Sequence, residues 1–396
     1  MAQFGKRNKR SLRSLVDNAQ HPRLTVHSGW QTEQLLSDAS QYFALMLHDI
    51  SKAKSRIDFN FYIVRLDGLG SKIIDALIKA SQRGVQVRLL MDGVGSSEHG
   101  GIIANRMAQA GCEVQIFRPL PFSPTLYRWS GLQGSGLQKL MHFLININQR
   151  NHYKLGIIDQ HIIWSGSFNI TGDHLAFEFG GKGWRDYGVR LTDDNTDDIQ
   201  HCFDALWSNA ARRPTLSRWN RFRTNLSVPM RMFYNKLMLF RIRFAKKRIW
   251  ISNAYFAPSR SIVRALIQAR KNKVDVRLIL PSVSDVALFP TISRSYYHQL
   301  LKHDIRIYKY SQRILHAKVM LIDDHCWIGS TNLNHRSFYH DLELDITLEK
   351  PDTIKAVKQQ LRIDMQQSHK LHYDDFSPYS WMMFKAHFLR IFRYWL

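Results

Sequence analysis

The sequence repeats one block of structure-forming segments, and this repeat restricts the possible folds more than any other feature. The stretches "SRIDFNFYI", "IIDALIKASQRGVQVRLLMD" and "GCEVQIFRP" lie between 55 and 119. The stretches "KRIWISNAY", "IVRALIQARKNKVDVRLILP" and "HDIRIYKYS" follow in the same order between 247 and 311, and the triplets "ALI" and "VRL" recur at equal spacing. Two copies predict two similar lobes, packed about a pseudo-two-fold axis.

Each copy alternates helical and strand-like segments. Ile74, Leu77 and Ile78 recur at helical spacing, and runs such as "VQVRLLM" are typical of buried strands. This alternation predicts an α/β fold with mixed sheets flanked by helices. The predicted divisions are a basic tail over 1–23, a first lobe over 24–211, a basic linker over 212–230, a second lobe over 231–372 and a C-terminal segment over 373–396.

A histidine and a lysine, two positions apart, follow each copy. They open "HYKLGIID" at 152–159 and "HAKVMLID" at 316–323. Residues two apart on a strand share a face. We therefore expect the members of each pair to point into one space; the pairs are His152 with Lys154, and His316 with Lys318.

Each motif continues into a turn and a second strand that ends in "GSFN" or "GSTN". Asp159 and Asp323 lie an odd number of positions after the histidines, so within the motif we interpret them as turn and support residues. The spacing from aspartate to glycine is one residue shorter in the second copy. Since a one-residue slip exchanges the faces of a strand, we expect the turn at "DDHC" to absorb the difference.

These residue types suit the chemistry of a phosphodiester. Each lysine places a compact cation on a non-bridging oxygen, where charge develops as phosphorus is attacked. One neutral imidazole can attack phosphorus while the other, protonated, donates to the departing alkoxide. We assign phosphate binding to the second-strand residues Ser167, Asn169, Ser330 and Asn332. Two acidic residues that open the next apolar-alternating stretches, Asp186 and Glu343, are expected to orient the rings.

The histidines have two other possible interpretations. A single histidine is more often a hydrogen-bonded structural residue, but the same set at corresponding points of a repeat argues against that interpretation. A metal site is disfavoured, because HExxH is absent and a lysine two positions from each histidine repels a cation. No metal is therefore predicted.

The paired motifs resemble the HxKxxxxD…GSxxN motifs of the phospholipase D superfamily. The likeness runs from about residue 24 to the C-terminus and is strongest to bacterial cardiolipin synthases that lack N-terminal membrane spans; it includes "WRDYGVRL", "NAYFAP" and "GSTNLNHRSFYHDLELD". The resemblance implies one active site between two lobes, no cofactor, His152 as nucleophile and His316 as acid. The catalytic motifs that it implies are completed by Lys154, Asp159, Lys318 and Asp323.

Charge and composition limit the partners of the chain. The formal net charge is +24 over 396 residues, and no acidic residue lies between Asp204 and Asp275. Such a field attracts nucleic acid or anionic lipid, although a merely solvated surface is the alternative. Three scattered cysteines argue against a disulfide framework and fit a reducing compartment. No signal peptide and no run of ~20 apolar residues is present, which predicts a protein that does not span a membrane.

Two segments outside the repeat suggest contact with lipid. The C-terminal "WMMFKAHFLRIFRYWL" at 381–396 places aromatic residues on one helical face and basic residues off it. This pattern suits an anionic membrane surface, with docking on the protein's own core as the alternative. The irregular insertion at 118–151 has no counterpart in the second copy, and we expect it to shape the lipid entrance.

Four functions are alternatives for such a chain. The favoured one is a phosphatidyltransferase that uses phosphatidylglycerol to form cardiolipin, peripheral on the cytoplasmic side of a bacterial cell membrane. A phospholipase D would hand the same intermediate to water. A nuclease or a non-catalytic lipid-binding module fits less well, and no nucleic-acid partner is expected. The donor, phosphatidylglycerol or phosphatidylethanolamine, and any protein partner are left open.

Overall fold

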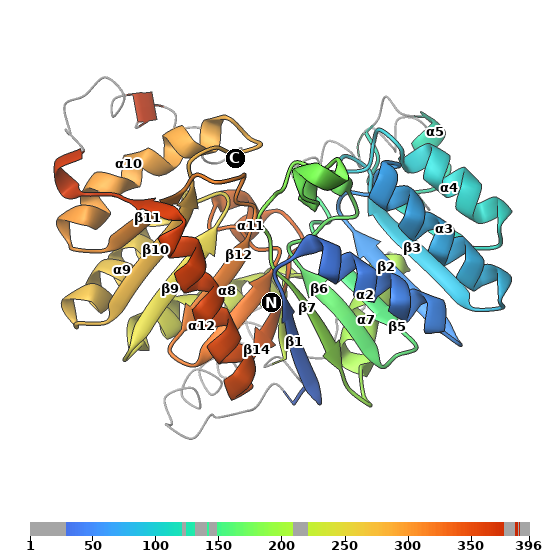
Figure 1. Cartoon of the computed structure of the whole chain (residues 1–396), viewed down its shortest axis with the longest axis horizontal. Coiled ribbons are helices and arrows are strands. Elements are labelled where there is room, and N and C mark those ends of the chain that lie inside the picture. Colours follow the sequence, from blue (N-terminus) through green and yellow to red (C-terminus); the bar gives the residue numbers. More distant parts are fainter. Residues whose placement is uncertain are drawn as a thin grey trace, which may run out of the picture.

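Two mixed β-sheets form the frame of the molecule, one for each copy of the repeat (Figure 1). The computed structural model describes residues 29–120, 124–130, 141, 149–208, 221–375, 385–386 and 388. The predicted tail at 1–23, most of the insertion at 118–151 and most of the C-terminal helix at 381–396 lie outside the described residues.

The first sheet has seven strands in the order β1-β7-β6-β5-β2-β3-β4. Its strands are β1 (Thr32–Leu36), β2 (Arg56–Phe61), β3 (Gln86–Asp92), β4 (Glu113–Phe117), β5 (Lys154–Ile158), β6 (Ile162–Gly166) and β7 (Gly188–Thr192). Its helices are α2 (Ala39–Lys52), α3 (Gly68–Gln82), α4 (Gly100–Gln109), α5 (Pro124–Tyr127) and α7 (Asp197–Trp207), with short turns η1 (Gly172–His174) and η2 (Phe177–Phe179).

The second sheet has eight strands in the order β15-β11-β10-β9-β12-β13-β14-β8. Its strands are β8 (Phe222–Thr224), β9 (Arg248–Asn253), β10 (Asp275–Pro281), β11 (Arg306–Tyr310), β12 (Lys318–Ile322), β13 (His325–Gly329), β14 (Leu344–Leu348) and β15 (Ser368–Lys370). Its helices are α8 (Val228–Phe244), α9 (Arg260–Lys271), α10 (Leu288–Lys302), α11 (His335–Tyr339) and α12 (Pro351–Gln366), with the turn η3 (Tyr373–Asp375).

The two sheets repeat the same arrangement. Strands β2, β3 and β4 are parallel, as are β9, β10 and β11, whereas the following hairpins are antiparallel. Polar caps start the crossover helices: the Asp67 side chain accepts the N–H of Leu69 at α3, and Ser259 accepts that of Ile262 at α9. The predicted α/β fold with two similar lobes is confirmed.

One predicted boundary changes. The linker expected over 212–230 contributes β8 to the edge of the second sheet, where Thr224 pairs with Leu344. Helix α8 then starts at Val228, so the second lobe begins before residue 231. The basic composition of this segment concealed a short strand, because a three-residue edge strand carries too few positions to show alternation.

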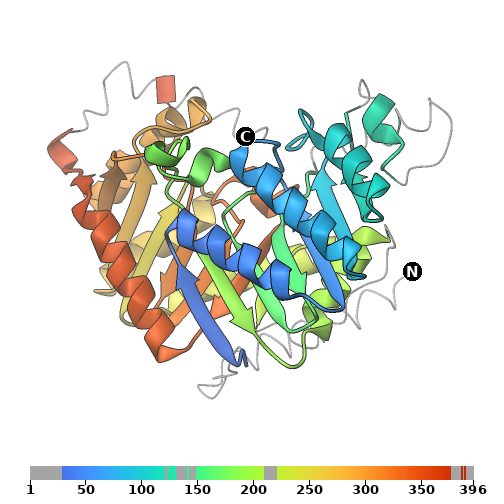
Figure 2. The ribbon, with the colours of Figure 1, turned by 45° about the vertical axis from the view of Figure 1, so that its right-hand side comes forward.

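The lobes share a hydrophobic core. One cluster of buried residues joins Val189 and Leu191 of β7 to Ile328 of β13 and Ile346 of β14. Helices α2 and α12 lie in front of the sheets in Figure 1 and remain in front after a 45° turn (Figure 2). An interior continuous across both lobes holds them in one fixed arrangement.

Polar contacts add to this interface. The buried carboxylate of Asp364 on α12 accepts hydrogen bonds from Arg185 Nε at 3.0 Å and Tyr187 Oη at 2.5 Å. Trp30 donates through Nε1 to the backbone oxygen of Thr347 at 3.1 Å. Because these groups are buried and paired, separation of the lobes would expose apolar surface and break charge-assisted bonds together.

Among the described residues, no helix combines the length and the apolar character that crossing a membrane requires.

Candidate active site

Both histidines lie where the two lobes meet, at one edge of each sheet. Strands β5 and β12 begin at Lys154 and Lys318, two residues after the histidines. We call the side of the two sheets on which these interior strands begin the site edge; it consists of strand ends and is not an edge strand. The sequence placed each histidine on the strand itself, and the structure instead puts it on the segment before the strand. There the N–H of His152 bonds to the Leu342 oxygen, and that of His316 to the Arg185 oxygen, both at 2.9 Å.

The two histidine rings are held by carboxylates from the opposite lobe. His152 Nδ1, from the first lobe, lies 3.0 Å from Glu343 Oε2 in the second. His316 Nδ1, from the second lobe, lies 3.1 Å from Asp186 Oδ2 in the first. A carboxylate on Nδ1 orients the ring and leaves Nε2 as the reacting atom. Neither motif histidine is therefore paired with a carboxylate of its own lobe.

The first-lobe carboxylate has a buried histidine as a further partner. His174 Nδ1 lies 2.9 Å from Asp186 Oδ2, and its Nε2 accepts the backbone N–H of Asn169 at 3.0 Å. Because Nε2 accepts, the proton of a neutral His174 ring resides on Nδ1 and points at Asp186. Sequence reasoning missed His174; its position five residues after Asn169, in a loop that follows the motif, was the available signal.

The second-lobe carboxylate is held by hydroxyl groups instead. Ser337 Oγ donates to Glu343 Oε1 at 2.5 Å and accepts the backbone N–H of Asn332 at 3.2 Å. Ser330 Oγ also donates to Glu343. Ser337 stands five residues after Asn332, as His174 does after Asn169, so the two lobes fill one structural position with different chemical groups.

The two lysines are buried beside the histidines. Lys154 and Lys318 have exposed fractions of 1% and 3%. Lys154 Nζ donates to the backbone oxygen of His152 at 2.8 Å, and Lys318 donates likewise to His316. Each ammonium thus retains donor capacity for a phosphate oxygen, because three N–H groups are available and each lysine has one such acceptor among the described residues.

Tyrosines close the side of the site next to each lysine. Tyr62 follows β2, and its ring centre lies 5.0 Å from that of His152 and 5.3 Å from Lys154 Nζ. Tyr255 lies two residues after the end of β9, and its ring centre is 6.2 Å from that of His316 and 5.6 Å from Lys318 Nζ. Sequence reasoning missed both, although "NFY" and "NAY" both stand where the first strand of a repeat copy ends, one residue out of step with each other. Such rings favour the charged form of the lysines and limit the access of water to them.

Burial and mutual repulsion shift the basic groups toward their neutral forms. Burial, then the nearby Lys154 and Lys318, hold the pKa of His152 well below its usual value. Burial and Lys318 also lower the pKa of His316, but Asp186 opposes that shift. Burial lowers the pKa of Lys318 to about 8, and burial with Lys318 as neighbour lowers that of Lys154. A bound anion would oppose these shifts and favour the charged forms of the histidines and lysines.

The two carboxylates respond to burial in opposite ways. Burial raises the pKa of Glu343 to about 8, although Lys154 and the two serines oppose the shift. Burial alone would also raise the pKa of Asp186, but the charge of His316 and the bond from His174 hold it well below its ordinary value. Asp186 is thus an anion near neutral pH, whereas Glu343 binds a proton readily.

The second-strand residues divide between two tasks. Ser167 Oγ donates to the Tyr187 oxygen at 3.2 Å and accepts the N–H of the same residue, so it fastens β6 to the start of β7. Ser330 is occupied by Glu343, as described above. By contrast, Asn169 Nδ2 and Asn332 Oδ1 are buried without a partner in the described part of the chain. The unpartnered N–H groups of Asn169 Nδ2 therefore suit a phosphate oxygen better than the serines, which position other groups, whereas Asn332 Oδ1 is an acceptor and cannot bond to that oxygen.

The motif aspartates lie at the far ends of the hairpins. Asp159 accepts the backbone N–H groups of Lys54, Ser55 and Arg56 at 2.8 to 3.0 Å. Asp323 accepts those at 246, 247 and 248 at 2.7 to 3.0 Å. Their carboxylates thus anchor the starts of β2 and β9 and are removed from the histidines. The catalytic assignment implied for Asp159 and Asp323 is corrected to the support role that their odd spacing predicts.

The turn absorbs the one-residue difference between the motifs. Leu155 pairs with Ser165 in the first hairpin, and Val319 pairs with Ile328 in the second, so each lysine has a glycine across from it. Three residues connect β5 to β6 and two connect β12 to β13. Asp159 and Asp323 both have positive φ, at 52° and 53°, which lets either turn reverse the chain tightly.

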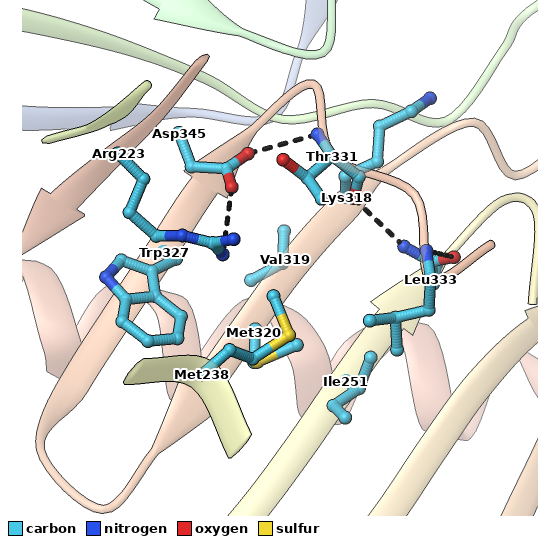
Figure 3. A pocket seen from close by; sticks show the side chains of 11 residues that line it. Arg223, Met238, Ile251, Lys318, Val319, Met320, Trp327, Thr331, Leu333 and Asp345 are labelled. Carbon is cyan, nitrogen blue, oxygen red and sulfur yellow. Dashed lines mark hydrogen bonds and ion pairs between the residues drawn. The ribbon is translucent and has the colours of Figure 1, made fainter. Parts of the chain in front are cut away.

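A small cavity lies behind the second lysine (Figure 3). Its volume is about 20 Å³, and its polar wall is the ion pair of Arg223 and Asp345, whose atoms lie 3.1 Å apart. Asp345 Oδ1 also accepts the N–H of Thr331, next to Asn332 in the chain. The ammonium of Lys318 points away from this ion pair (Figure 3). The cavity has room for about one water molecule, so it is too small for a substrate. We regard the ion pair in its wall as support for the loop at Thr331.

The described residues contain no group of three or more His, Cys, Asp or Glu side chains that could hold a metal ion.

Comparisons with known proteins agree with this geometry. The sequence profile of the family described as "Cardiolipin synthase, PLD-like domain" matches residues 46–207 and 238–365. "Cardiolipin synthase 2" of Bacillus anthracis is 31% identical over 367 residues, which cover 89% of this chain and 68% of the relative. "Cardiolipin synthase" of Clostridium perfringens (strain SM101 / Type A) is 30% identical over 369 residues, with 87% and 73% covered.

The fold also matches a solved structure. The crystal structure of phosphatidylserine synthase from Haemophilus influenzae Rd KW20 gives a TM-score of 0.65 at 13% identity, with 98% of this chain and 96% of that chain covered. Two like lobes that share a pair of histidines and a pair of lysines define an enzyme of the phospholipase D type. The chain belongs to the cardiolipin synthase family of that superfamily, and it is therefore an enzyme of phospholipid metabolism.

Proposed function

We propose that the protein transfers a phosphatidyl group through a phosphohistidine and forms cardiolipin from phosphatidylglycerol. The observation that carries the proposal is the crossed pair of histidines, with one imidazole on an ionised carboxylate and the other on a carboxyl group of raised pKa. Two imidazoles in unlike electrostatic settings fit two roles, nucleophile and acid.

In the first half-reaction, His152 Nε2 attacks the phosphorus of the donor lipid. A P–N bond forms, the bond from phosphorus to the leaving alcohol oxygen breaks, and His316 Nε2 gives that oxygen a proton. A depressed pKa keeps His152 neutral with its lone pair free, while the anionic Asp186 favours the protonated form of His316. Lys154 and Lys318 offset the charge that develops on the phosphoryl oxygens.

In the second half-reaction, a hydroxyl of phosphatidylglycerol gives its proton to His316. Its oxygen attacks phosphorus, the P–N bond breaks, and His152 is regenerated. Atoms balance with no further reactant: one glycerol leaves when both donor and acceptor are phosphatidylglycerol. Water in place of the acceptor would give phosphatidic acid, which is the outcome of a phospholipase D.

The charge of the chain supports a membrane location. A net charge of +24 favours the surface of an anionic bilayer over free solution. We propose that the enzyme works as a peripheral protein on the cytoplasmic side of a bacterial cell membrane, with anionic phospholipid as its substrate and no nucleic-acid partner.

The test is lipid mass spectrometry after purified protein acts on phosphatidylglycerol vesicles in the presence of a chelator. We expect cardiolipin and glycerol with the unmutated protein, and a loss of at least about 1,000-fold in His152→Ala and in His316→Ala. Phosphatidylethanolamine added as a second donor reports the choice of leaving group. Phosphatidic acid as the main product would overturn the transferase assignment while keeping the phosphoryl chemistry.

A trapping experiment separates the two histidines. With a donor whose leaving group needs no protonation, such as a p-nitrophenyl phosphodiester, His316→Ala should accumulate phosphorus on residue 152. His152→Ala should accumulate none. Phosphorus found on residue 316 in the His152→Ala protein would reverse the two roles.

A further inference from the structure

Loops that leave the site edge expose large apolar side chains. The loop between β6 and β7 exposes Phe177 by 71% and Phe179 by 62%. The connection from β10 into α10 exposes Val283 by 63% and Leu288 by 44%, and Tyr339 at the end of α11 is 52% exposed. We call these residues the apolar rim; its members are Phe177, Phe179, Val283, Val286, Leu288 and Tyr339.

Strand registers place the rim beside the catalytic groups. Lys318 at the start of β12 pairs with Asn253 at the end of β9, and Gly329 at the end of β13 pairs with Asp345. The β10–α10 connection therefore leaves the sheet at the edge where Lys318 enters it, because β10 runs parallel to β9. In Figures 1 and 2 the green segment after β6 and the orange segment before α10 lie on the same upper side of the molecule.

Two short contact chains link the rim to His316. Trp184 ends the loop that carries the two phenylalanines, and its ring centre lies 5.3 Å from the ring of His316. On the other side, Asp285 lies between Val283 and Leu288 in the chain and accepts the hydroxyl of Tyr255 at 2.6 Å. Tyr255 in turn faces His316. The apolar residues of both lobes thus flank the same catalytic histidine.

The charged residues around the apolar rim indicate which kind of partner it can contact. Lys182 is 60% exposed in the same loop as Phe177, next to Arg313, which lies against Gly183. The acidic residues between β6 and β7 are Asp173, which pairs with Lys182 at 3.0 Å, Glu178 and the buried Asp186. Exposed aromatic and aliphatic residues on the segments that leave the site edge indicate an apolar partner, and the net positive charge of the chain favours an anionic one. The boundary between headgroups and acyl chains of an anionic bilayer has both properties.

We propose that the apolar rim inserts into this boundary, so that a phospholipid enters the site without leaving the bilayer. The proposal rests on the proposed function, since it takes a membrane lipid as the substrate. It assigns the docking surface to the catalytic face itself, in addition to any contribution from the C-terminal segment. A soluble lipid monomer needs no such docking, and this difference gives the test.

The experiment compares the double variant Phe177→Ser/Phe179→Ser with the full-length parent. Binding is measured by co-sedimentation with vesicles of phosphatidylglycerol and phosphatidylcholine, and turnover is measured on those vesicles and on short-chain phosphatidylglycerol below its micelle concentration. We expect vesicle binding and vesicle turnover to fall about tenfold or more, while turnover of the monomer stays within about twofold. Phe244→Ser is the matched control, because Phe244 is 56% exposed and ends α8 just before β9 starts, at the opposite edge.

The outcomes are distinguishable. Unchanged vesicle binding in the double variant overturns the proposal, and so does an equal loss with Phe244→Ser. Equal loss of monomer and vesicle turnover also overturns it, since the rim would then act in folding or chemistry. Because sedimentation needs no turnover, a parent protein that binds through the rim but forms no cardiolipin would contradict the proposed function and leave the docking surface in place.

Discussion

His152 and His316 are the same residue type in matching motifs, yet their surroundings differ. His316 faces an aspartate that His174 and the ring itself keep ionised, whereas His152 faces a glutamate held by two serines. The charge of His316 and the bond from His174 lower the pKa of Asp186, whereas burial outweighs Lys154 and the two serines at Glu343, so the two carboxyl groups differ electrostatically. We therefore expect the division of roles between the two histidines to depend on the groups that hold their carboxylate partners.

Lysine titration should limit activity at high pH. Lys318 has its pKa lowered to about 8 by burial, so its cation is present below that pH and is lost as pH rises through it. We expect kcat/KM on a short-chain phospholipid to fall above pH about 8, because this ratio reports the free enzyme. Bound phosphate stabilises the cation of Lys318. The fall of kcat at alkaline pH should therefore begin at a higher pH than the fall of kcat/KM.

The control for this profile is Lys318→Arg, which keeps the charge at all accessible pH values. If the variant is active, its limb should move to higher pH or disappear. A limb at the same pH in both proteins would assign the titration to another group, such as Glu343, and would contradict the assignment to Lys318.

At the level of elements, the sequence was most informative where residues repeat. The alternation of strands and helices, the two lobes and the hairpin turns followed from periodicity and from the odd position of Asp159. The exchange of Asp186 and Glu343 between the lobes could not be predicted, because distance along the chain does not tell which lobe a side chain reaches. His174 and Tyr62 were missed for a related reason: each acts across a loop or a strand end, where no periodicity exists.

Replacement of Asp159, which supports the first hairpin, should reduce stability without a comparable loss of activity. Asp159 accepts three backbone N–H groups and the Ser55 hydroxyl, so Asp159→Ala should lower the free energy of unfolding by about 1–2 kcal/mol. We expect kcat per folded molecule to change less than about threefold, since the carboxylate lies at the far end of the hairpin. Urea unfolding and turnover at a temperature well below Tm measure the two effects; a loss of kcat with stability unchanged would restore a catalytic role.

The same aspartate should make stability depend on pH. Burial alone would raise its pKa, but the backbone bonds outweigh burial and hold the pKa below the usual value. Its stabilising contribution is therefore present above the ordinary pKa of ~3.9 and is lost as pH falls through the lower, folded-state value. The difference in unfolding free energy between the parent and Asp159→Ala should shrink accordingly below pH about 4.

For the whole molecule, the interface between lobes is part of the catalytic apparatus. Arg185 gives its backbone oxygen to the N–H of His316 and its guanidinium to Asp364. Asp364→Ala would leave Arg185 buried without its carboxylate, and we expect a loss of about 3–5 kcal/mol in stability. Since Arg185 also positions His316, kcat should fall as well, even at temperatures where the variant is folded. Retention of full kcat in a destabilised variant would contradict this coupling.

The exchange of carboxylates between lobes also has a consequence for synthesis. A ribosome that has completed only the first half of the chain has made His152 without Glu343, and Asp186 without His316. Neither reactive ring can be aligned until almost the entire chain has emerged and both halves have met. A nascent or truncated chain in contact with the membrane therefore cannot attack the lipids around it, and completion of translation itself switches the chemistry on.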